Sequence, residues 1–157
     1  MQTELNSNTG IYWNGTEYRY VKDGKDIGGI DSMPAGTEMD ALVAERVMGC
    51  KPEPWLDSHG YKSYRCTCLL SYPHNSQTGP MADLDLKSYS NDIAAAWEVV
   101  EKISLLHNWD LFPNEWKSNY SLHTLCFVIY DGTTSYTGKG STAALSICRA
   151  ALKAVMK

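Results

Sequence analysis

Three segments whose apolar residues recur at helical spacing constrain the fold of this chain more than any other feature. They predict helices over residues 38–49, 91–107 and 141–156, each with one apolar side that another element must cover. In the second segment the apolar side consists of Ile93, Ala96, Trp97, Val100 and Ile103. We therefore expect Trp97 to be buried and to anchor the core.

Polar residues at the starts of these segments indicate where each helix begins. The first helix is expected to start at Thr37, which together with Asp40 resembles a capping box. Ser90 is the expected N-cap of the second helix, with Asp92 in its first turn, and Ser141 is the expected N-cap of the third. The start of a helix also favours a bound anion, because its backbone N–H groups are unpaired there.

Residues 10–30 are predicted to form a small β-meander. The turn sequences Asn14-Gly15 and Asp23-Gly24 separate short strand-like runs in this region. A meander of this size is marginally stable by itself, so its aromatic residues need a covering surface. This need predicts a homo-oligomer whose interface includes residues 10–30.

Further strands are predicted nearer the middle and the end of the chain. Residues 62–72 form one, and residues 121–130 form another that is apolar on both faces and therefore central in its sheet. Residues 133–137 are expected to pair antiparallel with the central strand, whereas residues 109–116 are expected to form an irregular turn. The order of elements predicts an α+β fold, with helices packed on one mostly antiparallel sheet.

Length and composition limit the class of protein. The 157 residues suffice for one domain with its own core. A net charge of −4 argues against general nucleic-acid binding. Five cysteines at irregular spacing, among them Cys66 and Cys68, predict reduced thiols in a cytoplasmic protein. The sequence has no apolar run of membrane-spanning length, and its polar start predicts no signal peptide.

The segment Gly138-Lys139-Gly140-Ser141-Thr142 lies between a predicted strand and a predicted helix, as a phosphate-binding loop does. Its glycine spacing differs from that of nucleotide-hydrolysing loops, so we expect no hydrolysis at this position. Two interpretations stay open. The segment is either a capped turn, or a helix start at which Lys139, Ser141 and Thr142 hold an anion without cleaving it.

Two clusters combine aromatic rings with cations, and that combination can bind a nucleobase and its phosphate. The first cluster consists of Trp13, Tyr18, Arg19 and Tyr20, of which the first three are the expected ligand residues. The second consists of Trp55, His59, Tyr61, Lys62 and Arg65, of which Trp55, Tyr61 and Arg65 are the expected ligand residues. The alternative is that both clusters are amphipathic packing surfaces. No catalytic residue, metal site or cofactor is predicted, because the sequence carries no local signature for one.

Three separated motifs carry a family resemblance. They are MDALVAERVMG at 39–49, YSNDIAAAWEVVEKI at 89–103 and ALSICRAALKAV at 144–155. Together they resemble the phage ABA sandwich domain family, which comprises small proteins of bacteriophages and prophages. The resemblance implies a three-layer α-β-α sandwich over residues 37–157, preceded by a β-hairpin extension and linker over residues 1–36.

The resemblance also implies a phage protein made in the bacterial cytoplasm, and it supplies no catalytic residues. We therefore expect a counter-defence protein that sequesters a nucleotide-derived immune signal without cleaving it. The small anionic ligand would be held by the two aromatic clusters and by the helix starts near Ser90 and Ser141. The alternatives are a factor that binds a host or phage protein, and a nucleotide phosphoesterase.

Overall fold

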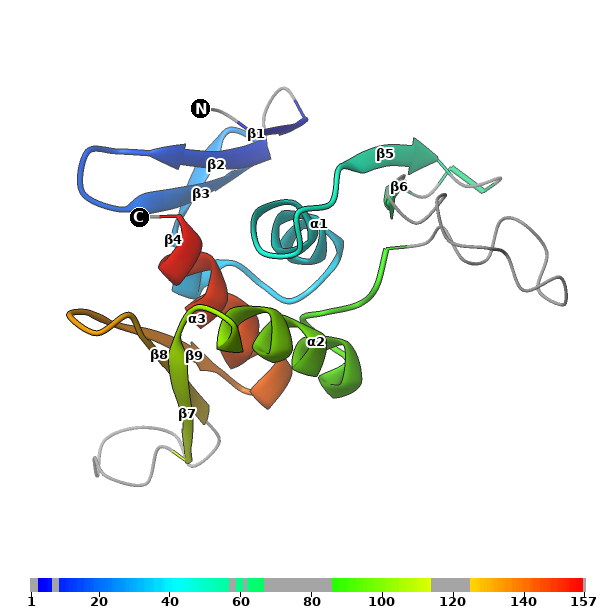
Figure 1. Ribbon diagram of the computed structural model, residues 1–157. Helices are drawn as coiled ribbons and strands as arrows, with labels where there is room; N and C mark the ends of the chain where they lie inside the picture. Colours follow the sequence, from blue (N-terminus) through cyan, green and yellow to red (C-terminus); the bar gives the residue numbers. More distant parts are fainter. Residues whose placement is uncertain are drawn as a thin grey trace, which may run out of the picture.

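The computed structural model describes residues 3–6, 9–56, 59–60, 62–66, 86–113 and 125–156 (Figure 1). Tyr61 and Cys68 lie outside these residues. So do the second half of the strand predicted at 62–72 and the first residues of the one predicted at 121–130.

Three α-helices occur where the sequence predicts them. They are α1 (Thr37–Arg46), α2 (Ile93–Ser104) and α3 (Ala143–Val155), and a short 3₁₀ helix, η1 (Ile30–Ser32), precedes α1. The most buried of the three is α3, in which nine of the thirteen residues are buried. This burial makes α3 the central helix of the molecule.

The predicted start of α1 is confirmed, whereas its predicted cap is not. The helix begins at Thr37, but the N-cap is Gly36. Asp40 does not complete a capping box, because its carboxylate accepts the backbone N–H of Ser90 at 2.7 Å. A contact between distant segments has thus replaced the expected local one.

The caps of α2 and α3 each lie downstream of the predicted residue. The carboxylate of Asp92 accepts the Ala94 N–H at 2.9 Å and caps α2. The hydroxyl of Thr142 accepts the Leu145 N–H at 3.2 Å and caps α3. Ser90 and Ser141 are therefore not the caps, because a polar residue later in the chain occupies the N-cap position of each helix.

The strands form three antiparallel sheets in the described part of the chain, where the sequence predicted one. The meander consists of β1 (Thr3–Asn6), β2 (Thr9–Trp13), β3 (Tyr18–Lys22) and β4 (Lys25–Gly29). A hairpin consists of β5 (Pro52–Leu56) and β6 (Lys62–Cys66). The third sheet consists of β7 (Asn108–Pro113), β8 (Leu125–Tyr130) and β9 (Ser135–Gly140). The α+β class and the antiparallel pairing are confirmed.

Strand β7 replaces the irregular turn that was expected over residues 109–116. It pairs with β8 along its whole length, with Trp109 opposite Ile129. The Trp109 ring stacks on Phe127 of β8, with ring centroids 5.4 Å apart. Packing against the neighbouring strand has overridden the turn preference of Asn and Pro, because strand formation depends mainly on cross-strand contacts.

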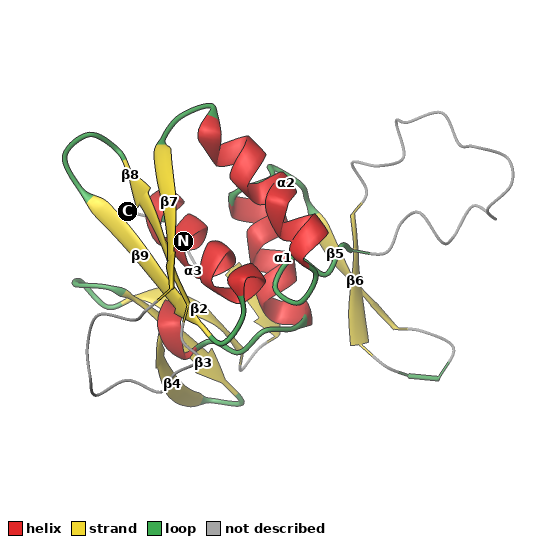
Figure 2. Cartoon of the chain, turned by 90° about the horizontal axis from the view of Figure 1, so that it is seen from below, coloured by secondary structure: helices red, strands yellow, loops and turns green. Residues whose placement is uncertain are grey.

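The helices lie together in the middle of the molecule (Figures 1 and 2). Helix α3 packs on β8 and β9, α2 packs on α3 and β7, and α1 packs on α3 and on the β5–β6 hairpin. In both views the meander and the β7–β9 sheet lie on one side of the helices, and the β5–β6 hairpin lies on the other.

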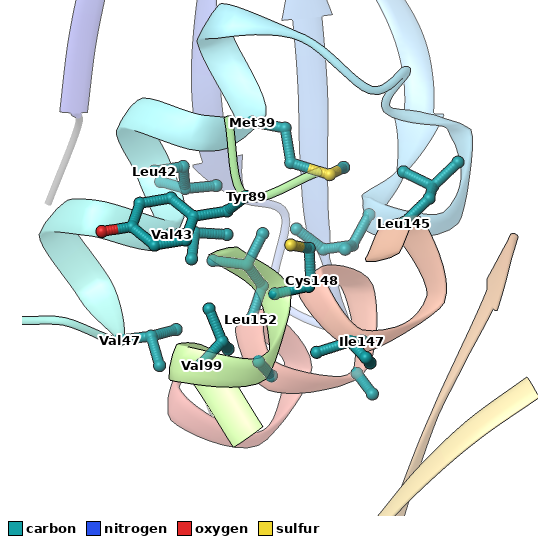
Figure 3. Close-up of a cluster of buried hydrophobic side chains, with 14 of the residues drawn as sticks. Met39, Leu42, Val43, Val47, Tyr89, Val99, Leu145, Ile147, Cys148 and Leu152 are labelled. Carbon is teal, nitrogen blue, oxygen red and sulfur yellow. The ribbon is translucent and has the colours of Figure 1, made fainter. Parts of the chain in front are cut away.

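The core joins all three helices to the meander. Figure 3 shows side chains from the three helices meeting around Cys148 and Leu152, both fully buried. Tyr20 and Ile11 extend this core into the meander, so much of the aromatic surface there is covered by the chain itself. Helix α3 packs between the other helices and the strands, and this packing covers the apolar sides of the three helices.

Trp97 is an exception to the predicted core. Its side chain is 39% exposed, and its ring meets Trp109 edge-on with centroids 5.5 Å apart. The buried side of α2 is turned away from it and consists of Ala95, Ala96, Val99, Val100 and Ile103. The expectation that Trp97 anchors the core is therefore wrong, because the ring lies at the edge of the apolar stripe. Among the described residues, no helix is long and apolar enough to cross a membrane.

Candidate functional site

The Gly-Lys-Gly segment is the last part of strand β9, and packing explains its glycines. A Cβ atom placed on Gly138 would lie 2.1 Å from the carbonyl oxygen of Ser146, in the backbone of α3. Gly140 also faces α3, whereas Lys139 between them is exposed. Because side chains alternate along a strand, Lys139 projects from the face opposite α3. The geometry matches a capped turn, with Thr142 as the cap.

Two cations of α3 bind backbone near this turn. Arg149 donates to the carbonyl of Lys139 and, at 2.7 Å, to that of Met33. Lys153 donates to the carbonyl of Thr137 at 2.7 Å and pairs with Asp31 at 2.6 Å. Burial lowers the pKa of Arg149, and the negative charge of Asp31 opposes that shift. These side chains fasten the segment before α1 to the edge of β9 through both terminal nitrogens of Arg149 and the Lys153 ammonium, whereas the Arg149 Nε has no hydrogen-bond partner among the described residues.

Ser90, expected at a ligand-binding helix start, is fully buried. Its hydroxyl accepts the N–H of Gly36 at 2.9 Å, and its own N–H donates to Asp40 at 2.7 Å. Burial raises the pKa of Asp40, and the hydrogen bonds from Ser90 oppose that rise. This network ties the start of α1 to the segment before α2. These contacts give Ser90 a structural role.

The meander cluster is divided between two faces of its sheet. Trp13 lies opposite Tyr18, and the two rings are tilted against each other with centroids 5.0 Å apart. Arg19 lies opposite Tyr12, one position along, and therefore projects from the other face. Trp13 is 52% exposed, so its ring is accessible. The aromatic pair and the cation do not face a common ligand position.

Two carboxylates already neutralise Arg19. Its guanidinium donates to Glu17 at 2.7 Å and to Asp26 at 3.0 Å. The hydrogen bond from Arg19 lowers the pKa of Asp26, which stays ionised beside it. A phosphate would have to compete with both carboxylates, so Arg19 is poorly placed to bind an anion.

Two residues of the hairpin cluster, Trp55 and Arg65, are in contact, whereas Tyr61 lies outside the described residues. Trp55 of β5 and Arg65 of β6 lie diagonally across the strand pair on one face. The guanidinium carbon of Arg65 lies 3.0 Å from the centre of the Trp55 ring. Both side chains are half-buried. Within the described residues Arg65 has no carboxylate partner, and its Nε atom has no hydrogen-bond partner.

The predicted ligand residues therefore occupy separate places. Trp13 and Tyr18 lie on the meander, and Ser141 and Thr142 lie where β9 leads into α3. The β5–β6 hairpin lies across the helices from both (Figures 1 and 2). Trp55 and Arg65 are the one pair in the described part of the chain that combines an aromatic face with a cation free of carboxylates.

An exposed aromatic surface, absent from the predicted site, lies where α2 meets β7. We call it the α2–β7 surface, and it is formed by Trp97 and Trp109, whose rings are in contact. Ile93 at the start of α2, and Leu105 and Leu106 directly after it, are also exposed. Trp109 donates from its indole N–H to Ser104 at 2.9 Å, which holds its ring against α2. The sequence signal was the pair Ile93 and Trp97, which are four residues apart and lie at the edge of the apolar side of the helix. It was interpreted as core because residue spacing alone does not say where a stripe ends.

Neither metal ligands nor reactive thiols gather at these positions. No group of three His, Cys, Asp or Glu side chains suited to a metal occurs among the described residues. Cys50, Cys126 and Cys148 form no disulfide, whereas Cys66 is disulfide-bonded. The prediction of reduced thiols is therefore wrong for Cys66, because its sulfur is oxidised in that bond. Burial raises the pKa of the Cys148 thiol, which is enclosed in the core.

Comparison with known proteins identifies a family and a similar solved structure. The phage ABA sandwich domain family matches residues 41–152. A phage protein from Bacillus cereus ATCC 14579, known from a 2.0 Å crystal structure, has a similar fold at 19% identity and a TM-score of 0.50. The match covers 78% of this chain and 93% of that one. A comparison with curated proteins gives no match.

The family match includes α2, most of α1 and α3, the β5–β6 hairpin and the third sheet. It begins after the meander and after the first residues of α1. The three motifs that suggested the family from sequence thus lie mostly within the matched residues. This chain belongs to the phage ABA sandwich domain family.

Proposed function

We propose that this protein is a phage counter-defence factor that acts in the host cytoplasm. It binds and sequesters a nucleotide-derived immune signalling molecule without cleaving it. The contact between Arg65 and Trp55 on the β5–β6 hairpin carries this proposal. Membership of a phage family supports the viral setting.

The Arg65–Trp55 pair suits a phosphate-bearing ligand with a flat base. Stacking on the indole ring holds the guanidinium plane in one orientation, so less conformational entropy is lost when it binds. A guanidinium without a carboxylate partner is open to a phosphate, which it binds through parallel N–H donors. A nucleobase can stack on an indole ring or on a guanidinium plane.

The expected affinity of one hairpin is modest. Stacking contributes roughly 1–3 kcal/mol per base, and a charge-assisted hydrogen bond roughly 1.5–3 kcal/mol. One Arg65–Trp55 pair therefore falls short of the roughly 12 kcal/mol needed for nanomolar binding. We propose that a homo-oligomer places hairpins of two copies around one ligand, which would multiply these contacts.

Calorimetry with mono-, di- and cyclic nucleotides tests the binding. The meander supplies matched controls, because it also holds an exposed tryptophan and an arginine. We expect Trp55→Ala and Arg65→Ala each to weaken binding about tenfold, or about 1.4 kcal/mol, and Trp13→Ala and Arg19→Ala to leave it nearly unchanged. No heat with any nucleotide, together with no small molecule released on denaturation, would refute the proposal.

A second candidate function is binding to a host or phage protein, which the α2–β7 surface favours. Trp97 is 39% exposed and Trp109 is 38% exposed, and Leu105 and Leu106, which directly follow α2, are exposed by more than three quarters. Exposed aromatic side chains in contact with each other are typical of protein interaction sites. Replacing Leu105 and Leu106 by Ser should abolish capture of a partner from infected cells while leaving nucleotide binding intact.

A further inference from the structure

Glu53 lies directly opposite Arg65 in the β5–β6 hairpin. Residues directly opposite each other in an antiparallel pair project from the same face, so Glu53 shares the face of Arg65 and Trp55. A glutamate and an arginine in these positions commonly form an ion pair. Here no ion pair forms between them, and the guanidinium lies over the Trp55 ring instead.

The carboxylate of Glu53 is consequently left exposed beside the stacked pair. It has no ion-pair partner among the described residues. Pro52 and Pro54 flank it, and their rings fix the backbone on both sides. The hairpin therefore offers three groups on one rigid face: an aromatic ring, a cation and two carboxylate oxygens that only accept hydrogen bonds.

These acceptors distinguish between the bases. The Watson–Crick edge of guanine carries two adjacent donors, N1–H and the N2 amino group, which match the two oxygens of one carboxylate. Adenine presents N1 as an acceptor there and would place it against a carboxylate oxygen. A buried or stacked base whose acceptor meets another acceptor loses the hydrogen bond and its solvation together.

We propose that the hairpin site selects guanine, with Glu53 accepting from the base edge, Trp55 and Arg65 providing the stacking platform, and Arg65 binding the phosphate. This inference rests on the proposed function and specifies its ligand as a guanosine monophosphate unit. A single phosphate is favoured over a triphosphate, because the negative charge of Glu53 offsets the positive charge of Arg65 on this face.

Calorimetry with guanosine, inosine and adenosine 5′-monophosphates tests the selection. Guanosine monophosphate should bind about tenfold more tightly than adenosine monophosphate, since a bidentate base contact discriminates by roughly that factor or more. Inosine monophosphate lacks the N2 amino group and should bind with intermediate affinity. Glu53→Gln should weaken guanosine monophosphate binding about tenfold and leave adenosine monophosphate binding unchanged or stronger, because an amide offers one acceptor and one donor.

Glu101→Gln on the exposed side of α2 is the matched control, since it removes the same charge away from the hairpin. Thermal unfolding of each variant, compared with that of the unchanged protein, verifies that the fold is intact. Equal affinity for guanosine and adenosine monophosphates, with both lost in Arg65→Ala, would overturn the guanine inference and leave the proposed function standing. Absence of binding by every nucleotide would overturn both.

Discussion

The close approach of α3 to β9 makes Gly138 the position where the smallest addition should do the most damage. A methyl group there would lie 2.1 Å from the Ser146 carbonyl oxygen and 2.4 Å from the Ala150 nitrogen. Ordinary contacts begin at 3.4 Å, so the helix would have to move by about 1.3 Å (3.4 minus 2.1). Neither obstructing atom can rotate away, because both belong to the helix backbone.

Moving α3 would disturb the best-packed element of the protein, since Ile147, Cys148 and Leu152 are all fully buried. Overpacking a core costs roughly 1–3 kcal/mol, and a clash with backbone places Gly138→Ala at the upper end, about 3 kcal/mol. For a chain of this length that corresponds to a fall of about 6–12 °C in the melting temperature.

Two other glycines provide a graded comparison. Gly140→Ala brings a methyl group 2.9 Å from the Ser146 nitrogen and should cost about 1–2 kcal/mol. Gly29→Ala meets the carboxylate of Glu17, a flexible and exposed side chain, at 3.2 Å and the Tyr18 carbonyl oxygen at an ordinary 3.8 Å. It should therefore cost under about 0.5 kcal/mol. None of the three glycines has a positive φ, so backbone strain does not confound the series.

Urea unfolding followed by circular dichroism measures the three costs under one condition. The reasoning requires the order Gly138, Gly140, Gly29, from the largest loss to the smallest. If Gly138→Ala unfolds within about 0.5 kcal/mol of Gly29→Ala, then the helix does not pack on the strand as closely as described. The Gly-Lys-Gly sequence would then need another explanation, and a phosphate ligand would return as one.

Three further predictions concern individual side chains. Trp97→Ala should cost under about 2 kcal/mol in urea unfolding, well below the roughly 3–5 kcal/mol of a buried tryptophan, because the ring is partly exposed. Burial raises the pKa of Asp40, so this carboxyl group keeps its proton to higher pH in the folded state than in the unfolded state. The contribution of Asp40 to the free energy of unfolding therefore falls as the pH rises above about 4. Asp40→Asn should therefore gain stability relative to the unchanged protein between pH 4 and 7, and a loss would contradict this sign. Arg149→Ala should cost roughly 1.5–3 kcal/mol, because two backbone carbonyls lose a charged donor, whereas Asp31→Ala, which breaks an exposed ion pair, should cost under about 1 kcal/mol.

The existence of the helices and of the meander followed from local patterns in the sequence. Apolar residues at helical spacing, and the Asn14-Gly15 turn, act over a few residues and leave a clear signature. The cap of α1 did not follow, because Asp40 bonds to Ser90, fifty residues away. Strand β7 was missed for a similar reason: the stacking of Trp109 on Phe127 joins segments that no local pattern connects.

The candidate site was predictable in composition but not in arrangement. The sequence grouped Trp55 with Arg65, and the hairpin brings the two together. It also grouped Trp13 with Arg19, which the strand pairing places on opposite faces. The sequence shows that side chains alternate between the two faces along one strand. Which residues of neighbouring strands share a face depends on the register between the strands, which the structure provides.

The two candidate surfaces differ in how they depend on the fold. The Arg149 side chain donates to the Met33 carbonyl, Lys153 to Asp31, and the Ser90 N–H to Asp40. These polar groups at the centre of the molecule therefore bind other parts of the protein. The β5–β6 hairpin contacts the rest mainly through α1, and Trp55 and Arg65 can change without opening the core. The α2–β7 surface is continuous with the core, since Trp109 stacks on the fully buried Phe127. Variants of the hairpin should therefore alter binding at constant stability, whereas variants of Trp109 should change both, and this contrast separates the two functions.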